Sequence, residues 1–220
     1  MIDLFDDQRF EGLPREGFEL FAEPSRERRR RAILETIHPP LQRLGDYLVR
    51  RLRAAAGAPL HTHLPQLNWP PGYQPFCTWL TLSFEAQGYQ EDAQLNIGVH
   101  ADYVAVRLGW DTRPDRFGRF EFLCRHGGLG DQMRELMAAS ELRLRVFASA
   151  RWPQGSRLVF ESATDVAGSF DEVERRGVWW ELGRHYPIGG EVCDPDFAKT
   201  AENDLRRLMP IYRRIASKVI

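Results

Sequence analysis

Three neighbouring segments in the middle of the chain alternate apolar and polar side chains with a period of two. They cover residues 79–84, 94–99 and 103–108. Such alternation is typical of strands that have one face in the core. Only His100-Ala101-Asp102 separates the last two segments, and so short a connection predicts an antiparallel hairpin. The chain is therefore expected to fold around an antiparallel sheet.

Helical patterns lie on both sides of these strands. A first helix is expected over residues 26–37, with Ser25 as a favourable N-cap and Pro39-Pro40 as its interruption. A second helix, with leucines at helical spacing, then runs to Gly57. A last helix is expected from about Pro195 to the C-terminus.

The region between these parts predicts further elements. We expect strands at residues 120–124, 142–146, 157–161 and 178–182. We also expect one helix that starts near Asp131 and a second, short helix over residues 170–176. Helices at the two ends and strands mostly in the middle favour an α+β fold over a regular βαβ alternation. The sequence thus predicts one α+β domain over residues 1–220, with a largely antiparallel sheet packed by N- and C-terminal helices.

Composition narrows the class of protein. The chain is 43% hydrophobic and 28% charged, with a formal net charge of −1, so no global positive field favours nucleic acid. Its three cysteines form no CxxC pair, which argues against both a disulfide framework and a zinc knuckle. No signal peptide or apolar run of about 20 residues is present. We expect a reduced, cytoplasmic protein without a membrane partner.

His61-Thr62-His63 is the first candidate for chemistry. On a strand the two rings would share a face, which is a spacing that supports metal binding. No further ligand lies nearby in the sequence, and prolines flank the pair, so histidines bonded by backbone groups in a loop are the favoured interpretation. We expect no bound metal and no cofactor. Distant partners would have to come from a set of four residues: His100, Asp102, His126 and His185.

Three other features have simpler structural interpretations. The glycine-rich connection at residues 126–131 could cradle a phosphate, but it matches no phosphate-binding motif, and Asp131 favours a helix N-cap. The run Arg26–Arg31 could contact nucleic acid, but Glu27 and Glu35 favour a solvated helix face. Cys77 is interpreted as a small core residue rather than a nucleophile.

The strand alternation also defines a polar surface. If the leucine, isoleucine and valine side chains face the helices, the opposite face carries a mixed set: Trp79, Thr81, Ser83, Gln94, Asn96, Tyr103 and Arg107. Aromatic rings, amides and a cation are typical of a groove for polar ligands, although a plain solvated sheet face remains the alternative. The proline-rich loop before the first strand would form the rim. The predicted ligand-binding residues are His63, Asn68, Tyr73, Trp79, Asn96, Tyr103 and Arg107.

The order of several short motifs resembles the YktB-like family of small uncharacterised bacterial proteins. The motifs are a Phe-rich start, residues 37–45 (IHPPLQRLG), a histidine ahead of NWPP, Thr78-Trp79, Gly88-Tyr89 and the hairpin at residues 94–106. The match covers about residues 18–110, with a further PIY near Pro210. The resemblance implies one α+β domain and no established reaction. The family's arginine pair and its lysine after Gly-Tyr are replaced here by Gln66-Leu67 and Gln90, so any anion bound through those cations would be lost or changed.

Three functions remain open. The leading prediction is a cytoplasmic binding module for a small polar molecule or a peptide segment. The alternative is an enzyme with His61, His63 or His100 as a general base, since histidine titrates near neutral pH. A weaker alternative is contact with nucleic acid through the Arg26–Arg31 helix.

Overall fold

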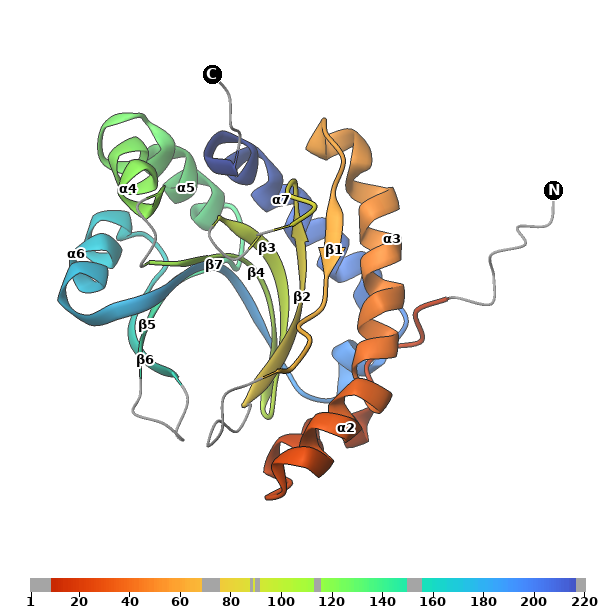
Figure 1. The fold of residues 1–220 in the computed structure, drawn as a ribbon. Helices are drawn as coiled ribbons and strands as arrows, with labels where there is room; N and C mark the ends of the chain where they lie inside the picture. Colours follow the sequence, from red (N-terminus) through yellow and green to blue (C-terminus); the bar gives the residue numbers. More distant parts are fainter. Residues whose placement is uncertain are drawn as a thin grey trace.

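The protein is built around one curved antiparallel sheet (Figure 1). The computed structural model describes residues 9–68, 76–87, 89, 92–112, 116–149 and 156–216. Within them the strand order is β1-β2-β3-β4-β7-β5-β6, and neighbouring strands are antiparallel. The strands are β1 (His61–His63), β2 (Cys77–Ser83), β3 (Gln94–His100), β4 (Tyr103–Asp111), β5 (Arg143–Ser149), β6 (Ser156–Ser162) and β7 (Gly177–Pro187).

Helices precede, interrupt and follow these strands. They are α1 (Arg15–Glu19), α2 (Arg26–Thr36), α3 (His38–Ala56), α4 (Arg116–His126), α5 (Leu129–Ala138), α6 (Val166–Arg176) and α7 (Phe197–Ala216), with 3-10 turns at Leu20–Ala22 and Gly190–Cys193. The described helices lie along the outer side of the curved sheet (Figure 1). The predicted α+β fold, with an antiparallel sheet packed by N- and C-terminal helices, is confirmed. No helix in the described ranges is long and apolar enough to cross a membrane.

The N-terminal helices begin and end as their sequence predicts. The Ser25 side chain accepts a hydrogen bond from the Arg28 backbone N–H at 3.4 Å and so caps α2. The helix α3 starts directly after α2, with its prolines in the first turn, where a missing N–H has no cost. Gly57 ends α3 in the left-handed conformation, with φ of 70°.

One apolar face of the sheet forms the core with these helices. Leu80, Leu82, Leu95, Ile97, Val104 and Val106 all have 0% exposure. Over this face α3 approaches closely at Gly45, whose missing side chain leaves room for Leu80. At the other end of the sheet, Phe120 of α4 packs edge-on against Trp180 of β7. Aromatic rings therefore close the core there, whereas leucines do so under α3.

The prediction of a strand at residues 120–124 is wrong, because this segment is the helix α4. Phe117, Phe120 and Cys124 are buried at helical spacing, whereas Phe122 is 62% exposed. Because Phe122 is apolar although exposed, Phe120, Phe122 and Cys124 gave an apparent alternation of apolar and polar residues that fits a strand. The glycine-rich connection thus joins two helices, not a strand and a helix.

The prediction that Asp131 is the N-cap of the next helix is also wrong. Gly128, with φ of 71°, occupies the N-cap position of α5, so Asp131 lies in the first turn. Its carboxylate there forms an ion pair with Arg134 and carries the negative charge that helix N-termini favour.

Candidate functional site

The strand register gathers polar side chains on the face of the sheet opposite the core, here called the polar face. Thr81 pairs with Asn96, and Asn96 pairs with Arg107, so the three side chains share this face. Trp79, two residues before Thr81, lies on it as well. The predicted grouping of residues along β2, β3 and β4 follows directly from this register.

A chain of hydrogen bonds runs across these strands. Thr81 Oγ1 donates to Gln94 Oε1 at 3.1 Å and accepts from Asn96 Nδ2 at 3.2 Å. Asn96 Oδ1 in turn accepts from Arg107 Nε at 3.2 Å. All four residues are buried, so each bond is shielded from water and its partner's position is fixed. The Arg107 guanidinium therefore has a defined orientation on the polar face.

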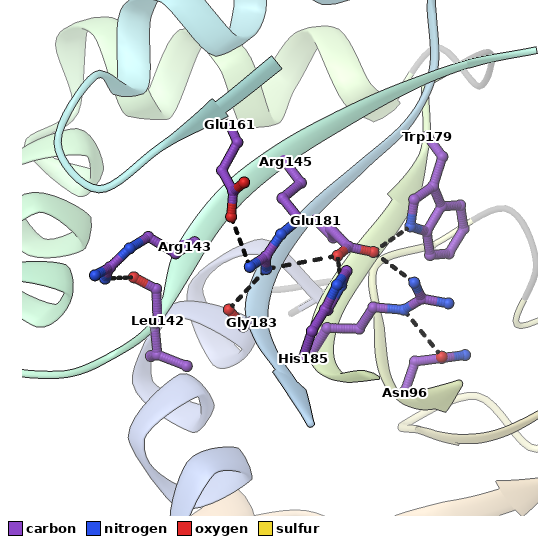
Figure 2. Close-up of polar contacts among 10 residues, drawn as sticks. Asn96, Leu142, Arg143, Arg145, Glu161, Trp179, Glu181, Gly183 and His185 are labelled. Atoms are coloured by element: carbon purple, nitrogen blue, oxygen red, sulfur yellow. Dashed lines mark hydrogen bonds and ion pairs between the residues drawn. The ribbon is translucent and has the colours of Figure 1, made fainter. Parts of the chain in front are cut away.

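The centre of the polar face is the carboxylate of Glu181, on β7 (Figure 2). Its side chain is fully buried, and it accepts hydrogen bonds from Arg107 Nη1 at 2.5 Å, His185 Nε2 at 2.6 Å and Trp179 Nε1 at 3.1 Å. Burial by itself would raise the pKa of Glu181, but Arg107, His185 and Arg145 more than offset this and hold the pKa well below its usual value. Glu181 is therefore a carboxylate at neutral pH.

Arg145 carries the network to the far edge of the sheet (Figure 2). One terminal nitrogen lies 2.8 Å from Glu161 Oε1, and the other donates to the Gly183 carbonyl at 3.2 Å and lies 4.0 Å from Glu181 Oε1. The polar network thus includes side chains from β2, β3, β4, β7, β5 and β6. Two arginines and two glutamates balance each other within it.

Glycines make room for the long side chains on this face. A Cβ on Gly98 would lie 2.7 Å from Arg107 Nη2, and a Cβ on Gly109 would lie 2.3 Å from the Trp179 ring. Arg107 and Trp179 can therefore lie flat across neighbouring strands, where the guanidinium stands 5.2 Å from the Trp179 ring centre. Any larger residue at these glycines would push the side chains out of the plane.

His100 ends the polar face near the start of β2. Its ring stacks on Tyr103 with centroids 4.2 Å apart, and Tyr103 stacks on His185 at the same distance. Burial, followed by the nearby Arg107, lowers the pKa of His100 well below its usual value, so the ring is neutral at physiological pH. Among the described residues, His100 Nε2 is buried without a hydrogen-bond partner. Such an orphaned nitrogen requires a physical explanation.

The other predicted site residues lie apart from Arg107. His63 shares the polar face through its pairing with Thr81, but its Nε2 lies 3.1 Å from Ser83 Oγ and 2.9 Å from the Glu85 carbonyl. Asn68 bonds Arg30 of α2 at 3.4 Å. Tyr73 lies outside the described residues.

His61 and His63 also border a surface cavity of about 450 Å³ between α3 and β1, together with Asp46, Arg50 and Leu60. The two histidines do form a short strand, which the flanking prolines had made doubtful. No group of three or more His, Cys, Asp or Glu side chains suited to a metal occurs in the described parts of the chain.

The arginine run on α2 has structural contacts. Arg29 bonds the Glu23 carbonyl through Nε at 2.7 Å, and Arg30 bonds the Leu67 carbonyl at 3.2 Å. Arg28 lies 3.5 Å from Glu23 Oε1. These bonds fix the start of α2 and join α2 to residues 66–68. Contact with nucleic acid through this helix stays a prediction.

Sequence reasoning missed the β7 and β5 members of the network. Part of the signal was present, because Trp179, Glu181 and Gly183 alternate with Trp180 and Leu182. The predicted strand stopped at residue 182, whereas β7 continues to Pro187. Which strands lie beside β4 depends on the fold, so the contact of Glu181 with Arg107 could not be predicted from the sequence.

Comparison with known proteins shows a resemblance to uncharacterised proteins and indicates no reaction. A family described as "Domain of unknown function (DUF1054)" matches residues 14–116. A UPF0637 protein of Lactococcus lactis subsp. cremoris (strain SK11) is 28% identical over 202 residues, which cover 90% of this chain and 96% of the relative. This chain resembles the UPF0637 family of uncharacterised bacterial proteins. UPF0637 protein YsbB of L. lactis subsp. lactis (strain IL1403) is 25% identical with the same coverage.

The resemblance to the YktB-like family that the motifs predicted is thus confirmed. The UPF0637 proteins have no stated function. The DUF1054 match includes Asn96, His100 and Arg107, whereas Arg145 and Glu181 lie beyond it.

Proposed function

We propose that the protein binds a small polar ligand on the polar face, with the Arg107 guanidinium as the anchor. The supporting observation is the set of hydrogen bonds that this guanidinium makes within the protein. Asn96 and Glu181 hold its Nε and Nη1, while Nη2 has no hydrogen bond to any described residue. A rigid guanidinium with one open N–H edge is suited to recognise an oxygen of a ligand, because little side-chain entropy is lost on binding.

The surroundings of Arg107 support a ligand rather than a bare surface. Trp79, Tyr103 and His185 keep part of their ring surface exposed, although the polar residues between them are buried. Aromatic surface beside fixed polar groups is typical of sites for small molecules. Asn96 positions Arg107, and Trp79 and Tyr103 supply contact area. A peptide segment that presents the same polar group is the other occupant of this class.

The proposal also includes the compartment in which the protein acts. We expect the protein to act in the cytoplasm, where Cys77, Cys124 and Cys193 remain free thiols. Burial raises the pKa of Cys77 to about 12, so this thiol beside the polar face stays protonated and is a poor nucleophile.

The test compares ligand binding by the wild type and by Arg107→Lys. Lysine keeps a charge near Glu181 but loses the planar fork, so we expect the thermal shift caused by a metabolite from a broad panel to disappear. Arg53→Lys on the exposed surface of α3 is the matched control and should keep the full shift. No shift with any panel member, or an undiminished shift in Arg107→Lys, contradicts the proposal.

A second variant guards against a folding defect. Lysine could leave Glu181 poorly paired, and an unpaired buried charge costs about 3–5 kcal/mol. The double variant Arg107→Met, Glu181→Met removes both charges together and is expected to fold. It should also show no thermal shift with the ligand.

One contact also favours an enzyme as the second candidate function. His185 Nε2 is held by the buried Glu181 carboxylate at 2.6 Å, which leaves the other ring nitrogen to act as a general base. Among the histidines, His185 has this orientation, whereas the predicted bases His61, His63 and His100 have no carboxylate contact in the described structure. Hydrolysis of a panel of esters by the wild type, lost in His185→Gln with ligand binding retained, would support this function.

A further inference from the structure

We infer that the ligand of the polar face carries a singly charged carboxylate, and that this group hydrogen-bonds His100 as well as Arg107 above Gly98. The inference rests on the proposed function and adds the chemical class of the ligand and a second contact residue. It begins from the buried ring nitrogen of His100.

His100 Nε2 is shielded from solvent and has no partner among the described residues. A buried polar atom without a hydrogen bond destabilises the folded protein, so an unliganded arrangement is the costly one. The other buried histidine of comparable exposure, His38, lies 2.9 Å from Thr78 Oγ1 through the same ring atom. The fold can therefore supply a partner for a buried histidine, and at His100 the partner is left to a ligand.

The open N–H edge of Arg107 and the orphaned nitrogen of His100 meet at Gly98. A Cβ at this position would lie 2.7 Å from Arg107 Nη2 and 3.3 Å from His100 Nε2. Both nitrogens thus lie close to the same point over Gly98, where the missing side chain lets the Arg107 guanidinium approach the His100 ring. A carboxylate can place one oxygen on each nitrogen, since its two oxygens accept separate hydrogen bonds.

The charge of the surroundings selects a single negative charge. Arg107 and Arg145 are balanced by Glu181 and Glu161, so the network has no surplus of positive charge. The Glu181 carboxylate would repel a dianion such as phosphate more strongly than a carboxylate. Burial raises the pKa of Tyr103, so its hydroxyl is neutral and adds no charge.

The protonation state of His100 fits this role. Because its pKa lies well below the usual value, the ring is neutral, and Nε2 can carry the single ring proton and donate it in a hydrogen bond to a carboxylate oxygen. Since Nε2 is closed to solvent in the unliganded protein, binding must also include a small movement of the surrounding side chains.

The experiment measures thermal shift and tryptophan fluorescence with four probes at matched ionic strength: acetate, benzoate, benzamide and inorganic phosphate. Benzoate should raise the melting temperature and change the fluorescence of Trp79 and Trp179, with acetate weaker. The neutral benzamide and phosphate should have little effect. A phosphate response as large as the benzoate response overturns the charge argument.

The contact with His100 is tested by His100→Phe, which keeps a ring against Tyr103. Loss of a hydrogen bond to a charged group should weaken benzoate binding about 10- to 100-fold. His100→Gln, which retains an N–H donor, should keep part of the affinity. His126→Phe on the exposed surface of α4 is the matched control and should bind normally. Undiminished benzoate binding by His100→Phe overturns the assigned contact.

The outcomes separate this inference from the proposed function. If a neutral or doubly charged member of the metabolite panel binds in an Arg107-dependent manner and no carboxylate does, the proposed function stands and this inference is wrong. If neither the metabolite panel nor the four probes contain a compound that binds the wild type, both are wrong.

Discussion

Two buried histidines with the same 8% exposure have opposite surroundings. His38 lies 2.9 Å from Thr78 Oγ1, whereas His100 Nε2 has no partner among the described residues. Burial lowers the pKa of both rings, that of His38 to about 4. Both are therefore neutral polar rings inside the protein, but only His38 has a hydrogen-bond partner for Nε2 among the described residues.

This difference predicts opposite effects of the same substitution. His38→Phe leaves the fully buried Thr78 hydroxyl unpaired and should lower the free energy of unfolding by about 1–3 kcal/mol. His100→Phe removes an unsatisfied nitrogen and should raise it by about 1 kcal/mol, or raise Tm by about 2–4 °C. Chemical denaturation of the two unliganded variants measures both. A loss of stability in His100→Phe equal to that in His38→Phe would contradict the interpretation of His100 as a residue kept for binding.

At the scale of the element, β7 decides where the site lies. The sequence alternation predicted β2, β3 and β4 and the set of side chains on their polar face, because strand pairs close in sequence determine their own register. It could not show that β7, about 70 residues later, pairs with β4 and brings Glu181 to Arg107. Long-range pairing depends on the packing of the whole sheet.

The same limit explains the error at residues 120–124. Three apolar residues at alternate positions fit a short strand. In the structure Phe117 and Phe120 of the helix α4 pack against Trp110. In a segment this short, the apolar residues fit both the two-residue period of a strand and the 3.6-residue period of a helix, so tertiary contacts decide which element forms.

The tight pairing of β4 with β7 gives an element-scale prediction. A Cβ on Gly183 would lie 2.4 Å from the Val106 carbonyl oxygen and 2.5 Å from Arg107 Cβ, and a backbone atom of a central strand cannot easily move away. Gly183→Ala should therefore lower the free energy of unfolding by about 1–3 kcal/mol. It should also weaken ligand binding, because Arg107 shifts.

Gly118 of α4 provides the matched control. A Cβ there meets no atom within 4 Å, and alanine favours a helix over glycine. Gly118→Ala should leave stability unchanged or raise it by up to about 1 kcal/mol. Urea unfolding of both variants is the measurement, and equal effects would contradict the close approach at Gly183.

For the whole molecule, buried titratable groups predict a loss of stability in acid in two steps. His38, with a pKa of about 4 when folded and 6.5 as its ordinary value, binds a proton more readily in the unfolded chain. Folding stability is therefore full above pH 6.5 and falls as the pH drops towards 4, by about 3 kcal/mol at most from this residue. His100 acts in the same direction.

The carboxylates Glu181 and Glu202 contribute the second step. Burial opposes ionisation of Glu202, but its bonds to Arg206 and Tyr47 hold its pKa at about 2, while Glu181 also stays well below its usual value. Stability from these groups is present above about pH 4.5 and is lost as the pH falls through the folded pKa values. Thermal melts from pH 8 to pH 2 should show both steps. His38→Phe should flatten the first step, and an unchanged slope would contradict its assignment.

The position of β7 between β4 and β5 has a consequence for synthesis of the chain. Four strands can pair as soon as residues 61–111 have left the ribosome, but the outer edge of β4 stays open until residues 177–187 follow. During that interval the edge can pair with another chain, and Arg107 has no buried counter-charge. The nascent protein therefore completes its polar face in one late event, when the strand that carries Glu181 closes the gap.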